Sequence, residues 1–217
     1  MNLAEFIDHT NLKPTATETD IRQLCAEAYQ YHLRTVCVPP SYVLYAADLL
    51  TDTSVKVCTV IGFPLGYNAT HVKVIEAEKA LDDGATELDM VMNLARFKSV
   101  AYASVREEIR TLAGLTQGRG ALLKVIIETA YLDEGEMRIA CELCAEAGAD
   151  FVKTSTGFAP TGAVLEQVRL IRSLLPDSMG VKASGGIQTA EGARAFLEAG
   201  ASRIGTSSGV ALMQSTQ

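Results

Sequence analysis

One short pattern, which occurs three times, restricts the fold of this chain more than any other feature. A helical segment is followed by Gly-Ala and then by a short apolar run, over Lys79–Asp89, Leu143–Lys153 and Phe196–Gly205. Glycine directly after a helix adopts the left-handed conformation that ends the helix, which other residues reach only at a cost in free energy. A degenerate copy spans His32–Cys37. Each copy predicts one helix followed almost at once by one strand.

Eight strands alternate with helices when the rest of the chain is read in the same way. Strict alternation favours a parallel sheet with helical crossovers, and eight units favour a closed (β/α)8 TIM barrel. Such barrels have about 250 residues, so a chain of 217 residues fits one trimmed barrel, a single catalytic domain over residues 1–217. The alternative is an open doubly wound sheet, which the lack of a Gly-x-Gly-x-x-Gly turn after the first strand disfavours.

The predicted strands are Phe6–His9, Thr35–Val38, Lys56–Ile61, Glu87–Val91, Leu122–Ile127, Phe151–Thr154, Gly180–Ala183 and Arg203–Gly205. The predicted helices span residues 17–31, 41–49, 69–82, 99–114, 133–147, 161–175 and 189–199, with a short one from 208.

Composition and charge exclude several classes of partner. A net charge of −7, without a basic cluster interleaved with aromatic residues, excludes nucleic acid as an expected partner. No run approaches the roughly 18 apolar residues that a membrane span needs, and the N-terminus lacks the features of a signal peptide. Five cysteines, an odd number, predict reduced thiols in a cytoplasmic protein. Cys141-x-x-Cys144 lies in a helical pattern without a second pair, so we expect no metal site there.

Two lysines interrupt apolar strands at the mouths of glycine-rich loops, Lys153 and Lys182. Because strand side chains alternate between faces, we expect both lysines and Asp89 to converge at the C-terminal ends of the barrel strands, where barrels carry their chemistry. A free lysine has a pKa of about 10.4 and is neutral in roughly one copy in a few thousand at pH 7, yet only the neutral amine attacks a carbonyl. Burial and a neighbouring cation both lower that pKa, so Lys182 would activate Lys153, or the reverse. The alternative is an interior ion-pair network that fills one layer of the barrel.

Three further residues belong to the same region by the strand pattern. Lys124 shares a strand face with Leu122 and Ile126, and we favour a role in which it pairs with a carboxylate. Asp8 ends the first apolar run, which is where a carboxylate that lines the cavity would lie. A position in the turn from strand to helix accounts for this aspartate nearly as well. Cys37 stands at a strand end, either as a core thiol or as part of the site.

Glycine- and serine-rich loops precede three of the predicted helices and indicate phosphate binding. Glycines let backbone N–H groups approach an anion, and a helix N-terminus adds about half a positive charge. Barrels commonly bind phosphate in the loops after strands 7 and 8. The candidate residues in these loops are Gly185, Gly186, Ser207 and Ser208, with Gly157 in the preceding unit.

Four motifs together are more specific than any single residue: Glu87–Asn93, Phe151–Gly157, Val181–Ile187 and Val60–Gly66. With them the chain closely resembles the deoxyribose-phosphate aldolases, a family of class I Schiff-base aldolases, over nearly its whole length. The resemblance implies that Lys153 is the Schiff-base lysine, Lys182 the lysine that lowers its pKa and Asp89 the proton relay. It places Asp8 and Cys37 in the lining of the site and implies no metal and no cofactor. The same resemblance implies that the phosphate-binding residues are Gly157, Gly185, Gly186, Ser207 and Ser208.

The reaction implied by this resemblance is the reversible cleavage of 2-deoxy-D-ribose 5-phosphate into acetaldehyde and D-glyceraldehyde 3-phosphate. Lys153 would attack C1, cleavage of the C2–C3 bond would leave an enamine, and Asp89, through water, would take the C3 hydroxyl proton. The expected partners are therefore a phosphosugar and aldehydes, with a second copy of the chain in a homodimer. Some family members close the chain with a tyrosine that assists proton transfer. This sequence ends Gln214-Ser-Thr-Gln217, so we expect that aid to be absent or to come from elsewhere.

Two other functions stay open on the sequence. One is a different Schiff-base phosphosugar aldolase of the same fold, which activity with acetaldehyde as donor would distinguish. The other is a non-catalytic barrel whose lysine binds pyridoxal phosphate, which a visible chromophore in the purified protein would reveal. The second needs no relay between Asp89 and Lys182 and is disfavoured for that reason.

Overall fold

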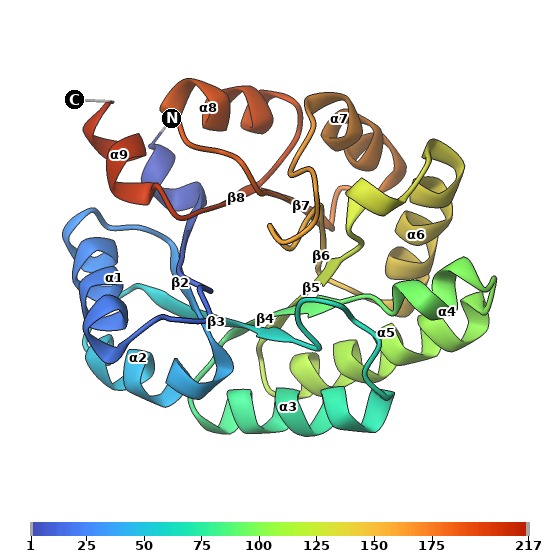
Figure 1. Ribbon diagram of the computed structural model, residues 1–217, viewed down its shortest axis with the longest axis horizontal. Helices are drawn as coiled ribbons and strands as arrows, with labels where there is room; N and C mark the ends of the chain where they lie inside the picture. The colour runs from blue at the N-terminus through green and yellow to red at the C-terminus, as the bar shows by residue number, and fades with distance from the viewer. Residues whose placement is uncertain (1, 216–217) are drawn as a thin grey trace.

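A computed structural model describes residues 2–215 of the chain, so Thr216 and Gln217 at the C-terminal end discussed above lie outside it. Eight parallel strands close into a barrel in chain order, with β1 hydrogen-bonded to β8, as the TIM-barrel prediction requires. Figure 1 looks down the barrel and shows the helices as an outer ring. The strands are β1 (Ile7–Thr10), β2 (Thr35–Val38), β3 (Lys56–Ile61), β4 (Glu87–Val91), β5 (Leu122–Ile126), β6 (Phe151–Lys153), β7 (Gly180–Ser184) and β8 (Arg203–Thr206).

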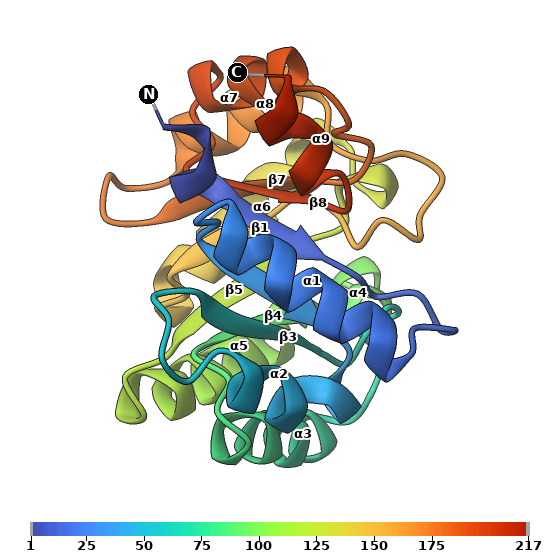
Figure 2. The ribbon, with the colours of Figure 1, turned by 90° about the vertical axis from the view of Figure 1, so that its left-hand side faces the viewer.

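The helices connect consecutive strands, and Figure 2 shows them flanking the barrel from the side. Their bounds are α1 (Glu18–Gln30), α2 (Val43–Leu49), α3 (Thr70–Asp82), α4 (Leu94–Lys98), α5 (Tyr102–Gly118), α6 (Glu134–Ala147), α7 (Leu165–Leu174), α8 (Ala190–Glu198) and α9 (Gly209–Gln214). Short 3-10 turns span Leu3–Phe6, Pro40–Tyr42 and Thr129–Tyr131.

The repeated Gly-Ala pattern marks helix ends as predicted. Gly84, Gly148 and Gly200 all have positive φ, at 101°, 82° and 105°. In each copy the strand then begins three residues after the glycine. The recurrence in the sequence therefore has a structural cause, because each copy turns the chain from the outer ring back into the barrel wall.

Several predicted boundaries differ from the structure. The first strand begins at Ile7 rather than Phe6, because Leu3–Phe6 forms a 3-10 turn. The predicted helix over 99–114 is wrong in its bounds: α5 spans Tyr102–Gly118, and a separate helix, α4, precedes it. The side chain of Asn93 accepts a hydrogen bond from the backbone N–H of Arg96 and so starts α4. Five residues are too few to show helical periodicity in the sequence.

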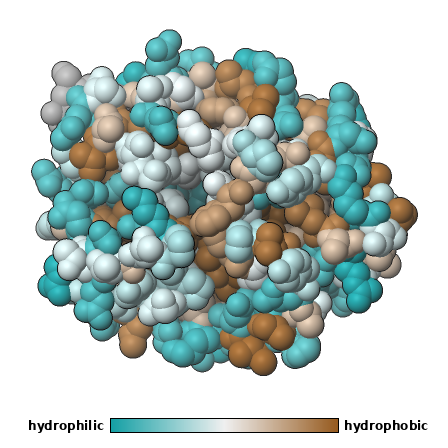
Figure 3. Space-filling model, viewed as in Figure 1, coloured by the Kyte–Doolittle hydropathy of each residue, from teal (hydrophilic) through white to brown (hydrophobic). Residues whose placement is uncertain are grey.

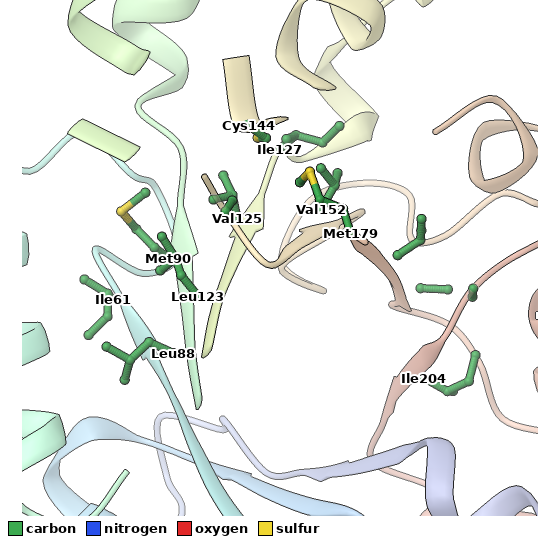
Figure 4. Close-up of a cluster of buried hydrophobic side chains, with 14 of the residues drawn as sticks. Ile61, Leu88, Met90, Leu123, Val125, Ile127, Cys144, Val152, Met179 and Ile204 are labelled. Carbon is green, nitrogen blue, oxygen red and sulfur yellow. The ribbon is translucent and has the colours of Figure 1, made fainter. Parts of the chain in front are cut away.

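The apolar core lies between the strands and the helices rather than along the barrel axis. Leu88 and Met90 of β4 point outward into this layer, as the alternation along the strand predicts, and so do Val125 and Val152 on the next two strands. Figure 4 shows these side chains on the outer side of the strands. Charged residues are among the inward-facing side chains at the same level, and they form the candidate site described next.

Candidate functional site

Asp89 is the centre of a charged cluster inside the barrel. Its Oδ2 accepts hydrogen bonds from Nζ of Lys153 and of Lys182, each at 2.8 Å, and its Oδ1 accepts one from Nζ of Lys124 at 2.9 Å. The three lysines come from consecutive strands, with Lys153 paired in register with Lys182 and Asp89 with Lys124. Asp89 is fully buried and Lys153 is 3 % exposed. The structure thus brings the three predicted catalytic side chains into direct contact.

Glycine at position 205 leaves the space that one of these lysines occupies. A methyl group added at Gly205 would lie 3.1 Å from Cε of Lys182 and 2.9 Å from Cβ of Ser184. In the repeated pattern this glycine occupies the position that holds Asp89 and Lys153 in the other copies. The small residue on β8 therefore allows the lysine on β7 to reach the centre of the barrel.

A second set of ion pairs lies beside Asp89 and includes residues that the sequence did not indicate. Arg203 Nη1 donates to Asp8 Oδ1 at 2.7 Å and to Glu87 Oε2 at 2.8 Å. Lys124 Nζ lies 2.6 Å from Glu87 Oε2, so it pairs with carboxylates as expected. Asp8 Oδ2 also accepts a hydrogen bond from Lys182. The interior ion-pair network considered as an alternative is therefore present, and it adjoins the three catalytic candidates.

The burial of this cluster and its charges act in opposite directions on each pKa. For Asp8, burial favours the neutral acid, but Lys182, Arg203 and Lys124 outweigh it and lower the pKa to about 2. For Asp89 the three surrounding lysines likewise overcome burial and hold the pKa well below its usual value. Burial opposes the charged form of Lys182, yet Asp8 and Asp89 raise its pKa above the usual value. Lys182 is therefore held as a cation beside Lys153.

A cavity of 590 Å³ opens at the C-terminal ends of the strands and reaches Lys153. The face seen in Figure 3 is hollowed over the middle of the barrel. Among the described residues, Lys153 is the one cation of the buried cluster that lines this cavity. Four of the predicted phosphate-binding residues line it as well: Gly157, Gly185, Gly186 and Ser207.

The loops around the cavity are held to one another by backbone contacts. Ala163 N–H donates to the carbonyl of Gly185 at 3.1 Å, and a methyl group at Gly162 would lie 2.2 Å from that oxygen. Gly157 and Gly186 have positive φ, and a methyl group at either would meet no atom within 4 Å. The glycines thus permit close packing of two loops and leave an open backbone surface toward the cavity.

Asp89 and Lys182 lie outside the cavity lining, and so do three of the predicted binding residues. Asp8 and Cys37 are fully buried beneath it, where Asp8 belongs to the ion-pair network. Ser208 precedes α9, and its N–H donates to Oγ1 of Thr206 at 2.9 Å. Asp8 and Cys37 therefore act on the site through their neighbours in this structure, and Ser208 stands at its edge.

Sequence reasoning missed three functional candidates. Arg203 stands at the start of a short apolar strand, the same signal that identified the lysines. Cys58 donates from its thiol to Asp89 Oδ1 at 3.3 Å. Glu128, in a left-handed conformation after β5, accepts hydrogen bonds from the N–H and Oγ1 of Thr156 and so holds the loop that carries Gly157. No local pattern marks Cys58 or Glu128, because their partners lie on other strands.

No helix within residues 2–215 is long and apolar enough to cross a membrane.

Comparison with known proteins identifies a family of similar chains. The family model described as DeoC/LacD family aldolase matches residues 3–215. A deoxyribose-phosphate aldolase of Thermococcus gammatolerans is 55 % identical over 216 residues, 99 % of this chain and 96 % of the relative. One of Caldanaerobacter subterraneus subsp. tengcongensis is 51 % identical over 215 residues, 99 % of this chain and 93 % of the relative.

Solved structures agree with these relatives. An aldolase named QR15 superposes with a TM-score of 0.95 at 48 % identity, covering 100 % of this chain and 96 % of that one. A deoxyribose phosphate aldolase of Aeropyrum pernix, described as a unique tetramer, gives a TM-score of 0.92 at 41 % identity, with 99 % and 90 % covered.

Proposed function

Because the chain belongs to the DeoC/LacD family of aldolases, we propose that it reversibly cleaves 2-deoxy-D-ribose 5-phosphate into acetaldehyde and D-glyceraldehyde 3-phosphate, through a Schiff base on Lys153. The observation that carries this proposal is the position of Lys153. It lies at the end of the charged cluster and also lines the cavity, whereas Lys124 and Lys182 are enclosed by carboxylates. A carbonyl carbon entering the cavity meets the amine of Lys153 before that of any other cluster lysine.

The charge balance of the cluster distinguishes Lys153 from the other three cations. Four cationic groups face three carboxylates, which leaves one excess positive charge within this cluster. Lys153 has one carboxylate partner, whereas each other cation has at least two, so Lys153 is held by the fewest ion pairs. The groups counted are Lys124, Lys153, Lys182 and Arg203 against Asp8, Glu87 and Asp89.

The reaction then uses Asp89 and Lys182 as fixed charges around the new bond. Lys153 Nζ attacks C1 of the open-chain aldehyde, and loss of water from the carbinolamine leaves an iminium. Its positive charge replaces that of the ammonium group beside Asp89, which stabilises it electrostatically. The iminium accepts the electrons of the C2–C3 bond as the C3 hydroxyl loses its proton, through water, toward Asp89. D-glyceraldehyde 3-phosphate leaves, and the enamine is protonated at C2 and hydrolysed to acetaldehyde.

The glycine-rich loops support recognition of the phosphate through backbone groups. The loops after β6, β7 and β8 contain no lysine or arginine between residues 154 and 164, 185 and 189, or 207 and 209. Lys13, which is exposed, lines the cavity from the β1–α1 connection. We assign the phosphate to the N–H groups at Gly185, Gly186 and Ser207, with Lys13 adding a positive charge at the rim.

Release of acetaldehyde from 2-deoxyribose 5-phosphate tests this function directly. Coupling to alcohol dehydrogenase and NADH makes acetaldehyde visible as a loss of absorbance, and the reverse reaction is followed with D-glyceraldehyde 3-phosphate and a series of donor aldehydes and ketones. We expect cleavage and a preference for acetaldehyde as donor. Cleavage absent with acetaldehyde but present with another donor would indicate the alternative Schiff-base aldolase.

The homodimer expected from the sequence stays a prediction. The Aeropyrum pernix relative is described as a tetramer. Light scattering of the purified protein distinguishes the two states by mass, and we expect twice the chain mass of 23.2 kDa.

A further inference from the structure

Two cysteines stand side by side inside the barrel and have no step in the reaction above. Cys37 on β2 pairs in register with Cys58 on β3. Both are fully buried and pack with Val60 in a small apolar cluster that is separate from the main core. Leu12, which packs against this cluster, lines the cavity, and this is the side from which a small oxidant would approach. Neighbouring strands lie about 4.8 Å apart, within the Cα separation of roughly 4.4–6.8 Å that a disulfide spans. The register therefore suits a covalent link without a shift of the backbone.

The two sulfur atoms are close together and chemically unequal. Both Sγ atoms and a carboxylate oxygen of Asp89 lie within 4.8 Å of one another. Its contact with Cys58 lowers the pKa of the Cys37 thiol, burial and the charge of Asp89 raise it, and Lys182 and Lys153 lower it, with a net lowering. Burial raises the pKa of Cys58 well above its usual value. Cys37 is thus the better thiolate, and Cys58 keeps its proton.

We propose that Cys37 and Cys58 form a redox pair, which hydrogen peroxide converts into a disulfide between β2 and β3. The Cys37 thiolate attacks one peroxide oxygen, the O–O bond breaks, and the leaving oxygen departs as water after protonation. The resulting sulfenic acid is attacked by the sulfur of Cys58, the S–O bond breaks, and a second water leaves. Two thiols lose two electrons, and hydrogen peroxide gains them. A dithiol reverses the reaction by exchange.

The same three side chains also resemble a metal-binding set, but their surroundings favour oxidation. Asp89 is already bonded to three lysines, and the cluster carries an excess positive charge, which repels a cation. Lys124 Nζ additionally donates to the sulfur of Cys58 at 3.5 Å. At Cys37 the charges of Lys182 and Lys153 favour the thiolate, which is the form that attacks peroxide.

The disulfide would act on the proposed active centre through Asp89. In the reduced protein the thiol of Cys58 donates to Asp89 Oδ1 at 3.3 Å, and a disulfide has no such proton. We therefore expect slower Schiff-base formation after oxidation and recovery after reduction. This effect rests on the proposed function, whereas formation of the disulfide is independent of it.

Peptide mapping tests the pair without any reference to catalysis. Reduced protein is treated with a few equivalents of hydrogen peroxide, alkylated with iodoacetamide under denaturing conditions and digested without reductant. We expect a peptide that links Cys37 to Cys58, which disappears after dithiothreitol. Its absence from wild-type protein, at doses that oxidise methionine, would overturn the proposal. So would a link between other cysteines.

Matched variants sharpen the result. Cys141 and Cys144 lie three residues apart on α6, and burial raises the pKa of Cys141 to about 12 and that of Cys144 well above its usual value. The double variant Cys141→Ser, Cys144→Ser should give the same linked peptide as wild type. Cys58→Ser should accumulate a sulfenic acid on Cys37 that dimedone captures. Sulfenic acid on Cys58 in the Cys37→Ser variant at the same rate would contradict the assigned order of attack.

Discussion

Lys73 and Lys153 are both buried lysines that contact one carboxylate, yet their surroundings differ in one decisive respect. Lys73, on α3, donates to Glu108 Oε1 on α5 at 2.7 Å and to the carbonyl of Val91 at 2.8 Å. A methyl group at Gly62 would lie 2.7 Å from its Cε, so the side chain is enclosed on that side. Lys153 contacts Asp89, which it shares with two other lysines, and it lines the cavity.

The difference shows that burial alone does not make a lysine a candidate nucleophile. Burial lowers the pKa of Lys73 despite the opposing effect of Glu108, but no substrate reaches its amine. At the barrel centre, an excess of cations accompanies an open path for a carbonyl compound. Access and charge excess together therefore define the site, and each of the following predictions tests one side of this comparison.

The largest effect is expected from removing the amine at the cavity. Lys153→Met should lower kcat/KM for 2-deoxyribose 5-phosphate by roughly 10⁴-fold, because no other amine lines the cavity among the described cluster residues. Lys73→Met is the matched control and should change it less than about three-fold, within ordinary variation between unrelated sites. The coupled acetaldehyde assay measures kcat/KM for both variants. Equal losses of kcat/KM would contradict the claim that Lys153 and Lys73 have different roles.

Removal of the shared carboxylate should have the next largest effect. Asp89→Asn keeps the shape of the side chain but takes one negative charge from three lysines. We expect kcat to fall by roughly 10²–10³-fold with a smaller change in KM, because iminium stabilisation and proton transfer are both weakened. Retention of more than a tenth of the wild-type kcat would show that Asp89 is structural.

The ion pair between Lys73 on α3 and Glu108 on α5 should contribute to stability rather than to activity. Lys73→Met leaves the carboxylate of Glu108 buried without its cation, and loss of one partner of a buried pair costs about 3–5 kcal/mol. Lys73→Met combined with Glu108→Leu should recover most of that loss. Urea unfolding curves measure both, and a double variant no more stable than the single one would contradict this interpretation.

The interior carboxylates predict how stability depends on acid. The pKa of Asp8 is about 2 in the folded chain, against the usual 3.8, so its contribution is present above pH 4 and is lost as the pH falls toward 2. This lowering of the Asp8 pKa corresponds to roughly 2 kcal/mol of unfolding free energy. Asp8→Asn should flatten the fall in unfolding free energy between pH 4 and pH 2, measured by urea unfolding at each pH. An unchanged slope would assign the acid sensitivity to other groups.

The smallest expected effect concerns the rim of the cavity. Lys13→Gln should raise KM for 2-deoxyribose 5-phosphate about five-fold, the equivalent of roughly 1 kcal/mol for an exposed charge. KM for unphosphorylated 2-deoxyribose should not change, because that sugar lacks the charge. Equal changes for both sugars would mean that Lys13 shapes the entrance instead of binding phosphate.

Much of the fold and part of the site follow from local sequence patterns. The glycine after each repeated helix predicts where the chain turns, and alternation along β4 predicts that Asp89 points inward while Leu88 and Met90 point outward. The convergence of Lys153 and Lys182 follows from their places on neighbouring strands. These inferences use only spacing, which is why they hold without knowledge of the partners.

Contacts across the barrel could not be predicted in this way. Arg203 bonds to Glu87 across 116 residues of sequence, and to Asp8 across 195. Which lysine lines the cavity depends on how the loops pack over the strands, as at Gly162 and Gly185. Such features arise when the sheet closes, and no local pattern carries them.

Reductive trapping tests the central claim most directly. Wild-type protein is incubated with acetaldehyde and sodium borohydride, digested, and mapped by tandem mass spectrometry for a reduced two-carbon adduct on lysine. We predict the adduct on Lys153, with Lys73, Lys124 and Lys182 unmodified. An adduct on Lys124 or Lys182 in place of Lys153, or no adduct at all, would contradict the account of access and charge given above.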